Sequence, residues 1–420
     1  MYSFSLCSAV LLFSAFMGLF SLPGHAGATY RLEKVVEISR HGVRPPSPDN
    51  RKAIENGSAR RWGHWAAKDG ELTEHGYQAA WLKGRFESSY YRAAGLLGKG
   101  CPDKRDFYLR ASPMQRTRAT AQALAEAAFP GCQVRVHSAI DFDPLFQLPA
   151  TKVSKKQATA AYQEALRAAG GNLHAAQARL QPQIEALKQA VCRPDSPCPA
   201  FSQPWRLAVW SNGTLGIKGL DALAAMAETL RLEWSENKPS DEVAFGNVKN
   251  QAQLAKLLPL LSFKYDYTND LPEQARRGAS KLMTQIADGL RLKTAGLPRA
   301  AFPDAPPDVR WLLYVAHDIN IAWLRTMLDF HWQQADYPPG NIPPGGSLVF
   351  ERWRHHDQHF IRIYFQAQSL AQLRDLTPLG KEDPPLLTEL KFPGCEQTAV
   401  GTLCPYQAAM QRIEKNIGTF

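Results

Sequence analysis

The chain has 420 residues, 45% of them hydrophobic and 21% charged, which is enough for one large domain with an insertion or for two domains. This composition is ordinary for a globular protein and excludes a fibrous or largely disordered chain. The formal net charge of +10 favours anionic partners, but there is no dense Lys/Arg block or aromatic ladder, so nucleic acid is not expected among them.

The first 28 residues differ from the rest of the chain. An apolar run from Leu6 to Leu22 carries no charged side chain and is followed by small residues at 26–28. This pattern is typical of a secretory signal peptide, and an uncleaved membrane anchor is the alternative. We therefore assign 1–28 to a signal peptide. The mature protein is expected to be periplasmic or secreted, monomeric, and without stable membrane association.

The cysteines agree with export. Six of the seven lie outside the signal, and an even count in an exported chain indicates disulfides, although about fifteen pairings are open to six cysteines. A metal site is the alternative, but CxxC spacing and neighbouring histidines are lacking. Pairing of sequence neighbours is the simplest arrangement and predicts Cys101–Cys132, Cys192–Cys198 and Cys395–Cys404.

Two strands that lead into helices are expected in the first third of the mature chain. The first strand covers residues 33–39 and ends at Arg40-His41-Gly42 in a proline-rich loop; Thr73 then caps a helix running to the region of residue 90. Gly76 and Gly84 in this helix indicate close backbone packing. The second strand covers 106–111, and Ser112-Pro113-Met114-Gln115 predicts a helix start with Ser112 as N-cap. That helix runs to about residue 128, and a strand at 133–137 follows.

The middle of the chain is predicted to be helical. Residues 151–191, 213–234 and 251–261 show helical patterns without clear strands. A continuous apolar strand then covers 311–316 and ends at His317-Asp318, where another helix begins. Residues 347–353 and 360–366 alternate like a hairpin near the sheet edge. The predicted fold is therefore α/β, with a mixed, mostly parallel sheet flanked by helices (29–145 and 265–420) and an inserted, smaller, mainly helical domain (146–264).

Chemistry-bearing residues gather where the predicted strands end, which is where open α/β sheets bind their ligands. The imidazole of His41 is a candidate nucleophile for phosphorus if its other nitrogen is fixed by a hydrogen bond. Arg40, Arg44 and Arg116 offer planar forks that suit phosphate oxygens. His317 adds a further donor, and Asp318 can supply a proton.

These segments resemble the histidine acid phosphatases. Residues 40–46 match the RHGxRxP signature of that family, and His317-Asp318 matches its HD pair. Further matches lie at 72–76, 115–117, 143–146, 343–346 and 350–353, and the bacterial periplasmic phytase and glucose-1-phosphatase branch looks closest. The resemblance implies a phosphoglycerate-mutase-like fold and no metal or other cofactor. It also implies a phosphorylated His41, an acid Asp318, and a phosphate held by Arg40, Arg44, Arg116 and His317.

The substrate is less well defined by the sequence. Ser47-Pro48 stands where phytate-using relatives often carry Thr-Lys, Asn320 is retained, and Glu228 and Glu233 lie where relatives place a substrate-facing glutamate. We expect a small anionic phosphate ester, with inositol phosphates preferred and sugar phosphates such as glucose 1-phosphate as the alternative. A non-catalytic phosphate binder and a basic surface-binding module are the other classes considered.

Overall fold

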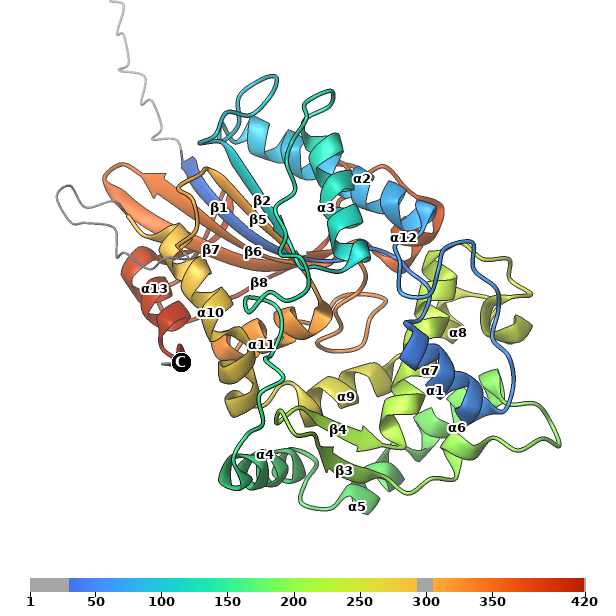
Figure 1. Ribbon diagram of the computed structural model, residues 1–420. Helices are drawn as coiled ribbons and strands as arrows, with labels where there is room; N and C mark the ends of the chain where they lie inside the picture. The colour runs from blue at the N-terminus through green and yellow to red at the C-terminus, as the bar shows by residue number, and fades with distance from the viewer. Residues whose placement is uncertain (1–29, 293–304, 419–420) are drawn as a thin grey trace, which may run out of the picture.

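The computed structural model describes residues 30–292 and 305–418, so the predicted signal peptide lies outside it. A central eight-stranded sheet has the order β2-β5-β1-β6-β7-β10-β9, with β8 paired to β7 (Figure 1). Its strands are β1 (Arg31–Arg40), β2 (Phe107–Ala111), β5 (Trp311–Ala316), β6 (Ser347–His355), β7 (Gln358–Ala367), β8 (Leu386–Glu389), β9 (Glu396–Thr398) and β10 (Gly401–Pro405).

The sheet is mixed, as predicted. β2, β5 and β1 form a parallel core, and the strands beyond β1 are added antiparallel. Every residue of β5 is buried, which fits an apolar strand covered by helices on both faces. The predicted hairpin is present as β6 and β7, but its placement near the edge is wrong. β6 pairs with β1 in the middle of the sheet because β8, β9 and β10 extend the sheet past β7.

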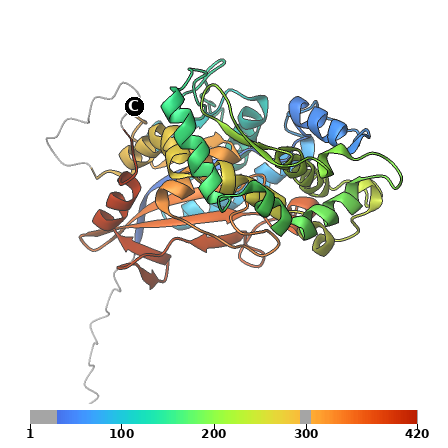
Figure 2. The ribbon, with the colours of Figure 1, turned by 90° about the horizontal axis from the view of Figure 1, so that it is seen from below.

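Helices cover both faces of the sheet (Figures 1 and 2). α2 (Glu74–Ala93) and α3 (Gln115–Ala128) lie on one face, and α10 (Pro272–Leu290), α11 (Asp318–Leu328) and α13 (Tyr406–Glu414) lie on the other. The predicted cap of α2 is confirmed, since the Thr73 side chain accepts from the Gly76 amide. A Cβ on Gly84 would come within 2.7 Å of the Leu124 carbonyl oxygen, so this glycine lets α2 and α3 pack closely.

Two predictions next to α3 are wrong. Ser112 does not cap the helix, which begins at Gln115 after Met114 and has no side-chain cap. The hydroxyl of Ser112 is instead used inside the protein, 2.8 Å from Thr117 Oγ1. The strand expected at 133–137 is reduced to one bridge between Arg110 and His137. The His137 amide donates to the Leu109 carbonyl of β2 at 2.9 Å and its carbonyl accepts from the Ala111 amide at 2.8 Å, whereas the Val134 amide turns back to the Cys132 carbonyl.

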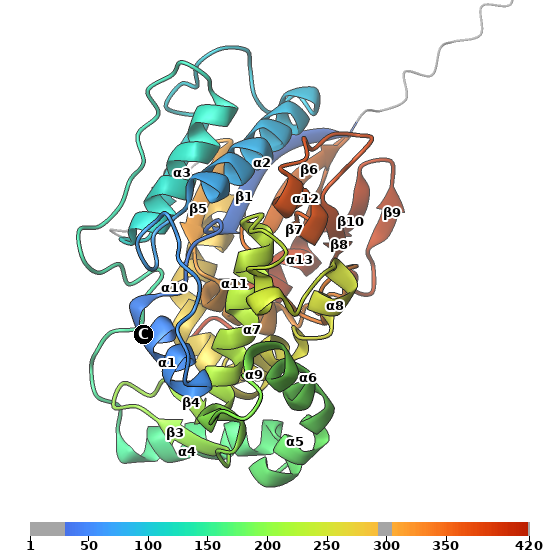
Figure 3. The same ribbon diagram turned by 90° about the vertical axis from the view of Figure 1, so that its right-hand side faces the viewer.

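A mainly helical lobe lies beside the sheet (Figure 3). Its elements are α4 (Lys155–Ala168), α5 (Leu173–Arg179), α6 (Gln181–Val191), η1 (Pro199–Phe201), β3 (Arg206–Val209), β4 (Leu215–Lys218), α7 (Leu220–Ser235), η2 (Val243–Gly246), α8 (Gln251–Ala255) and α9 (Pro259–Thr268). The β3–β4 hairpin was missed: no element was predicted for β3, and β4 lies within the helix predicted from residue 213 onward. α1 (Pro48–Ser58) packs against α7, although it lies early in the chain. The domain boundaries at 145/146 and 264/265 stay a prediction.

Disulfides and a buried cluster of charged side chains stabilise the fold around the central sheet. The three predicted disulfides are confirmed. Under the sheet, the Lys83 ammonium group lies 2.6 Å from Glu37 and 2.8 Å from Glu87, and it reaches the Ser39 hydroxyl at 3.5 Å. This buried cluster anchors β1 to α2 one residue before Arg40. α12 (Leu370–Asp375) packs on α7. Of the helices in the described ranges, none is both long and apolar enough to cross a membrane.

Candidate active site

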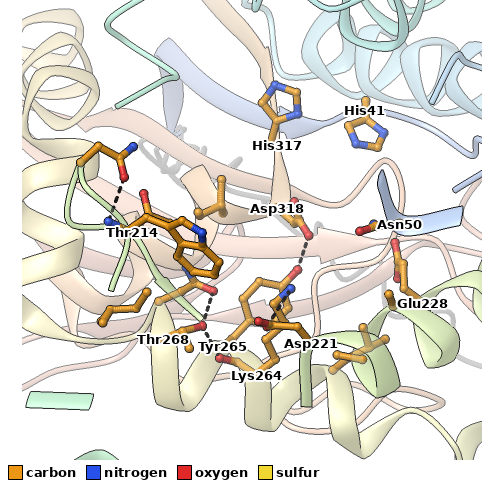
Figure 4. Close-up of a pocket in the computed structure, with 18 of the residues that line it drawn as sticks. His41, Asn50, Thr214, Asp221, Glu228, Lys264, Tyr265, Thr268, His317 and Asp318 are labelled. Atoms are coloured by element: carbon orange, nitrogen blue, oxygen red, sulfur yellow. Dashed lines mark hydrogen bonds and ion pairs between the residues drawn. The ribbon is translucent and has the colours of Figure 1, made fainter. Parts of the chain in front are cut away.

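The site lies where the parallel strands β1 and β5 end side by side. Arg40 pairs with Ala316 across the two strands, and the His41 amide donates to the Ala316 carbonyl at 3.1 Å. The residues that follow, His41 and His317, therefore point toward one another, with their ring centroids 5.7 Å apart (Figure 4). The predicted convergence of the two motifs, which are 276 positions apart in the sequence (317 − 41), is thus present in the structure.

His41 is held as a neutral imidazole with one fixed nitrogen. Its Nδ1 lies 2.9 Å from the Gly42 carbonyl oxygen, and a carbonyl can only accept, so Nδ1 carries the proton. Nε2 is left with a lone pair. Burial and the nearby cations Arg116, Arg40 and Arg44 hold the pKa of His41 well below its usual value. This is the protonation state that a nitrogen nucleophile needs.

The loop that carries His41 is packed tightly against α2 and α3. A Cβ on Gly42 would come within 2.9 Å of the Gly76 carbonyl oxygen, and one on Gly76 would come within 2.4 Å of the Val43 carbonyl oxygen. The Gly42 amide donates to Thr120 Oγ1 at 3.0 Å. Glycine is therefore required at both positions, and the loop backbone has little freedom to move.

Arg44 and Arg116 form the cationic wall of the cleft. Both are largely buried, and each donates to one backbone carbonyl, Pro45 for Arg44 and Gly70 for Arg116. Neither Nε has a hydrogen-bond partner among the described residues. Burial and the charge of Arg44 lower the pKa of Arg116 to about 10. The two largely buried guanidiniums therefore lack both a countercharge and acceptors for some of their N–H groups, and a bound anion would supply both.

Arg40 is placed differently from the other two arginines. It is fully buried behind the cleft, donating to the Ile342 carbonyl at 2.7 Å and to Glu228 Oε1 at 2.5 Å. It also lies 3.9 Å from Asp318 Oδ2. Burial lowers the pKa of Arg40, but the charges of Glu228 and Asp318 outweigh this and raise it. Arg40 therefore contributes mainly its positive charge to the site, and it presents few free hydrogen-bond donors to the cleft.

His317 is oriented by the hydroxyl that was predicted to cap α3. Its Nε2 lies 2.9 Å from Ser112 Oγ. Thr117 already donates its hydroxyl to backbone carbonyls, so Ser112 must donate to Thr117 and accept from His317. Burial and Arg116 lower the pKa of His317 to about 3, so its Nδ1 lacks a proton while no anion is bound.

Asp318 is the carboxylate of the cleft. It is the first residue of α11, and its Oδ2 accepts from the Tyr265 hydroxyl (Figure 4). Burial raises the pKa of Asp318, but Arg40 and the Tyr265 hydrogen bond lower it more, so the net shift is downward. The side chain remains 30% exposed and lines the same cleft as His41, so a proton can pass between it and a ligand.

The weaker sequence candidates are placed as follows. Glu228 lines the cleft and is bonded to Arg40 and Arg231. Glu233 is buried away from the cleft lining and accepts from the Ala244 amide. Ser47 caps α1, accepting from the Asn50 amide, and it is Asn50 that lines the cleft. Asn320 is fully buried and positions the motif, because its side chain accepts from the His317 amide and donates to the Phe146 carbonyl.

Sequence reasoning missed two residues that shape the chemistry. Tyr265 holds Asp318, and Ser112 holds His317. Tyr265 lies on α9, far from any recognisable motif, and only the fold reveals its contact. Ser112 was singled out as a cap, so its polarity was the available signal. Across residues 30–292 and 305–418, no group of three or more His, Cys, Asp or Glu side chains is arranged to hold a metal ion.

The comparisons with known proteins agree with this geometry. The histidine phosphatase superfamily (branch 2) matches residues 31–366. Phytase AppA of Escherichia coli is 31% identical over 409 residues, 92% of this chain and 92% of that protein. Glucose-1-phosphatase of Salmonella typhimurium is 29% identical over 415 residues, 96% and 95% of the two chains. The crystal structure of Klebsiella sp ASR1 phytase superposes with a TM-score of 0.86 at 47% identity, covering 93% of this chain and 97% of that one.

Proposed function

Because this chain belongs to the histidine phosphatase superfamily (branch 2), we propose that it is a metal-independent acid phosphomonoesterase working through a phosphohistidine on His41. The observation that carries the proposal is that His41, Arg44, Arg116, His317 and Asp318 line one cavity. A nucleophile, cations for the phosphoryl oxygens and a proton donor for the leaving oxygen can thereby reach one phosphate ester.

The first half of the reaction transfers the phosphoryl group. Nε2 of His41 forms a bond to phosphorus as the ester P–O bond breaks, and protonated Asp318 gives its proton to the leaving oxygen to release an alcohol. Arg44 and Arg116 stabilise the charge on the equatorial oxygens. The ring becomes positively charged once Nε2 is phosphorylated, and the Gly42 carbonyl stabilises it through Nδ1–H.

The second half releases phosphate. The carboxylate of Asp318 takes a proton from water as that water attacks phosphorus, and the N–P bond breaks to restore His41. Asp318 can act as an acid in the first step only if it is protonated while substrate is bound. A phosphate dianion supplies this condition, since its charge offsets the arginines that lower the pKa of Asp318. Acidic solution favours the same state.

For the substrate we favour inositol phosphates, with a sugar phosphate such as glucose 1-phosphate as the alternative. The similarity to the Escherichia coli and Klebsiella phytases supports the first, and the similarity to the Salmonella glucose-1-phosphatase supports the second. The cavity of about 730 Å³ has room for a ring with several substituents. Three disulfides support export to the periplasm or beyond, because they persist in oxidising compartments.

The test uses leaving groups of different basicity in EDTA-treated protein at pH 4 to 6. His41→Ala is expected to abolish phosphate release from every ester. Asp318→Asn is expected to cost about 10²–10⁴-fold with phytate and glucose 1-phosphate, whose alkoxide leaving groups need a proton. The loss should be much smaller with para-nitrophenyl phosphate, whose phenolate leaves unaided.

The exposed residues His331 and Asp329 supply matched controls, since His331→Ala and Asp329→Asn change the same residue types outside the cleft. Both controls should keep wild-type rates. Substantial turnover by His41→Ala, or an Asp318→Asn loss that is equal for all leaving groups, would refute the assigned roles.

A further inference from the structure

One wall of the cleft is formed by helix α9, and most of the side chains that it contributes have no role in the proposed reaction. α9 presents Leu261, Lys264, Tyr265 and Thr268 to the cavity, a spacing that puts them on one helical face. Tyr265 reaches the catalytic carboxylate, whereas the Lys264 ammonium group lies 3.5 Å from Asp221 Oδ1 on α7. In Figure 4 Asp318 lies between the two histidines and this ion pair.

An exposed tryptophan lies beside the pair. The Trp210 side chain lines the cleft and is 49% exposed, which is unusual for so large an apolar group. Its six-membered ring packs on Gly216, where a Cβ would come within 2.3 Å of the ring and within 2.6 Å of Asp221 Oδ2. The indole and the carboxylate are therefore neighbours. We call Trp210, Asp221 and Lys264 the distal subsite.

The hairpin turn that carries Trp210 is firmly anchored. Gln274 donates to the Gly213 carbonyl at 3.1 Å, and Arg277 donates to the Asn212 carbonyl at 2.8 Å, so the turn is tied to α10. On its other side the Val153 amide donates to the Ser211 carbonyl at 2.9 Å. An exposed aromatic ring on a fixed turn provides a preformed face for the apolar side of a ligand ring.

The Lys264–Asp221 pair is weak enough to be replaced. The two side chains are partly buried, at 37% and 31% exposed, and the 3.5 Å between Lys264 Nζ and Asp221 Oδ1 is longer than a charge-assisted hydrogen bond of about 2.7–2.9 Å. Asp221 Oδ1 is buried and has no hydrogen-bond partner among the described residues, so its contact with Lys264 is a charge interaction and not a full hydrogen bond. A dianionic phosphate offers Lys264 more charge and more acceptor oxygens than one carboxylate does.

We propose that the distal subsite binds a second phosphate group of the substrate on Lys264, with the substrate ring against Trp210, and that Asp221 limits this binding to acidic solution. The proposal rests on the proposed function, in which the first phosphate occupies the cationic wall next to His41. It assigns specificity for esters that carry more than one phosphate, as inositol polyphosphates do and glucose 1-phosphate does not.

The dependence on acid follows from the surroundings of Asp221. Burial raises the pKa of this carboxyl group, with Lys264 opposing the shift. The facing hairpin contributes Trp210, Asn212 and Thr214, which carry no charge. Glu228, two turns along α7, is neutralised by its own arginine partners. Protonation of Asp221 therefore leaves Lys264 uncompensated, whereas ionised Asp221 cancels its charge and repels phosphate.

Binding to the His41→Ala protein tests the proposal without turnover. In titration calorimetry at pH 4.5, adding Lys264→Met should lower the affinity for myo-inositol hexakisphosphate about tenfold and the affinity for phenyl phosphate at most twofold. Lys264→Arg should restore most of the affinity, and Lys156→Met, at an exposed position on α4, is the matched control. Equal losses for both ligands, or no loss for either, would overturn the proposal.

Asp221→Asn tests the acid dependence in the same background. Between pH 4.5 and 7, the ratio of the affinities for myo-inositol hexakisphosphate and phenyl phosphate should fall in the protein that keeps Asp221 and stay nearly constant in the Asp221→Asn variant. An identical fall in both proteins would overturn the role of Asp221. The outcome is separable from the proposed function. If the wild-type chain binds hexakisphosphate selectively but hydrolyses no phosphate ester, the proposed function is refuted and the distal subsite stands. If it hydrolyses phosphate esters but binds the two ligands equally well, the distal subsite is refuted and the proposed function stands.

Discussion

Replacement of Tyr265 by Phe is the sharpest test of how the acid is controlled. The Tyr265 hydroxyl donates to Asp318 Oδ2, and this bond stabilises the ionised carboxylate. The substitution removes one oxygen and keeps the buried ring, so packing on α9 is preserved. The expected result is an acid that accepts its proton more readily and works at higher pH.

The magnitude follows from the charge on the acceptor. A hydrogen bond to a charged group is worth about 1.5–3 kcal/mol, and about 1.4 kcal/mol corresponds to one pKa unit. Losing the Tyr265 bond should therefore raise the pKa of Asp318 by about 1–2 units. Arg40 still lowers this pKa in the variant, so the carboxyl group keeps part of its shift.

The assay is the single-turnover rate of His41 phosphorylation by an alkyl phosphate, measured from pH 3 to 8 with enzyme in excess. In the proposed mechanism this step needs protonated Asp318, so its rate should fall as Asp318 ionises. The falling limb of the pH profile should move up by about 1–2 pH units in Tyr265→Phe. Tyr267→Phe, on the same helix but packed in the core of the helical lobe, is the control and should not move it. A limb that stays in place in Tyr265→Phe contradicts the reasoning.

Three further outcomes are expected. Without ligand, Arg116→Met should melt at or above the wild-type temperature, because it removes one of several like charges that lie close together in the cleft. Inorganic phosphate at 100 times its Kd stabilises a protein by about 2.7 kcal/mol, and the variant should lose most of this stabilisation. A melting temperature below that of the wild type without ligand would count against this reasoning. Lys83→Met removes the cation between two buried glutamates, Glu37 and Glu87, and should cost about 3–5 kcal/mol in denaturant unfolding at pH 7. The cost should shrink as the pH falls, because burial and the neighbouring Glu37 raise the pKa of Glu87 and so favour its neutral form. Replacing Cys101 and Cys132 by Ser opens a 31-residue separation and should cost about 4 kcal/mol; a loss under 1 kcal/mol would contradict the chain-entropy account.

The parts of the fold that the sequence predicts best are those with strong local signals. β5 is a run of apolar residues that stops at His317, and its bounds are those expected. Thr73 likewise marks the start of α2, and Gly76 and Gly84 mark the places where its backbone is packed closely. The convergence of His41 and His317 was also predictable, because parallel strands bring their carboxyl ends to one edge of a sheet.

The parts that escaped prediction depend on contacts between distant segments. The β3–β4 hairpin has strands of four residues whose apolar pattern resembles a helix start, and its position is fixed by α10. The central place of β6 follows from the strands that come after it in the chain. Tyr265 and Lys264 are ordinary residues of a helix, and only the meeting of α9 with α7 and α11 gives them neighbours with which to act.

The site explains why an acid phosphatase of this kind should bind its ligand and its protons together. Without an anion, burial and the guanidiniums of Arg116, Arg44 and Arg40 lower the pKa of His317, and the Nε donors of these three arginines have no partner among the described residues. His317 cannot offer Nδ1–H to phosphate, and Asp318 cannot protonate a leaving group, until each gains a proton. A phosphate dianion compensates the arginines and makes both protonations easier, so its binding and theirs reinforce one another. Acidic conditions for the chemical step then follow from the charge balance around His41, independently of the role proposed for Asp221 in binding a second phosphate.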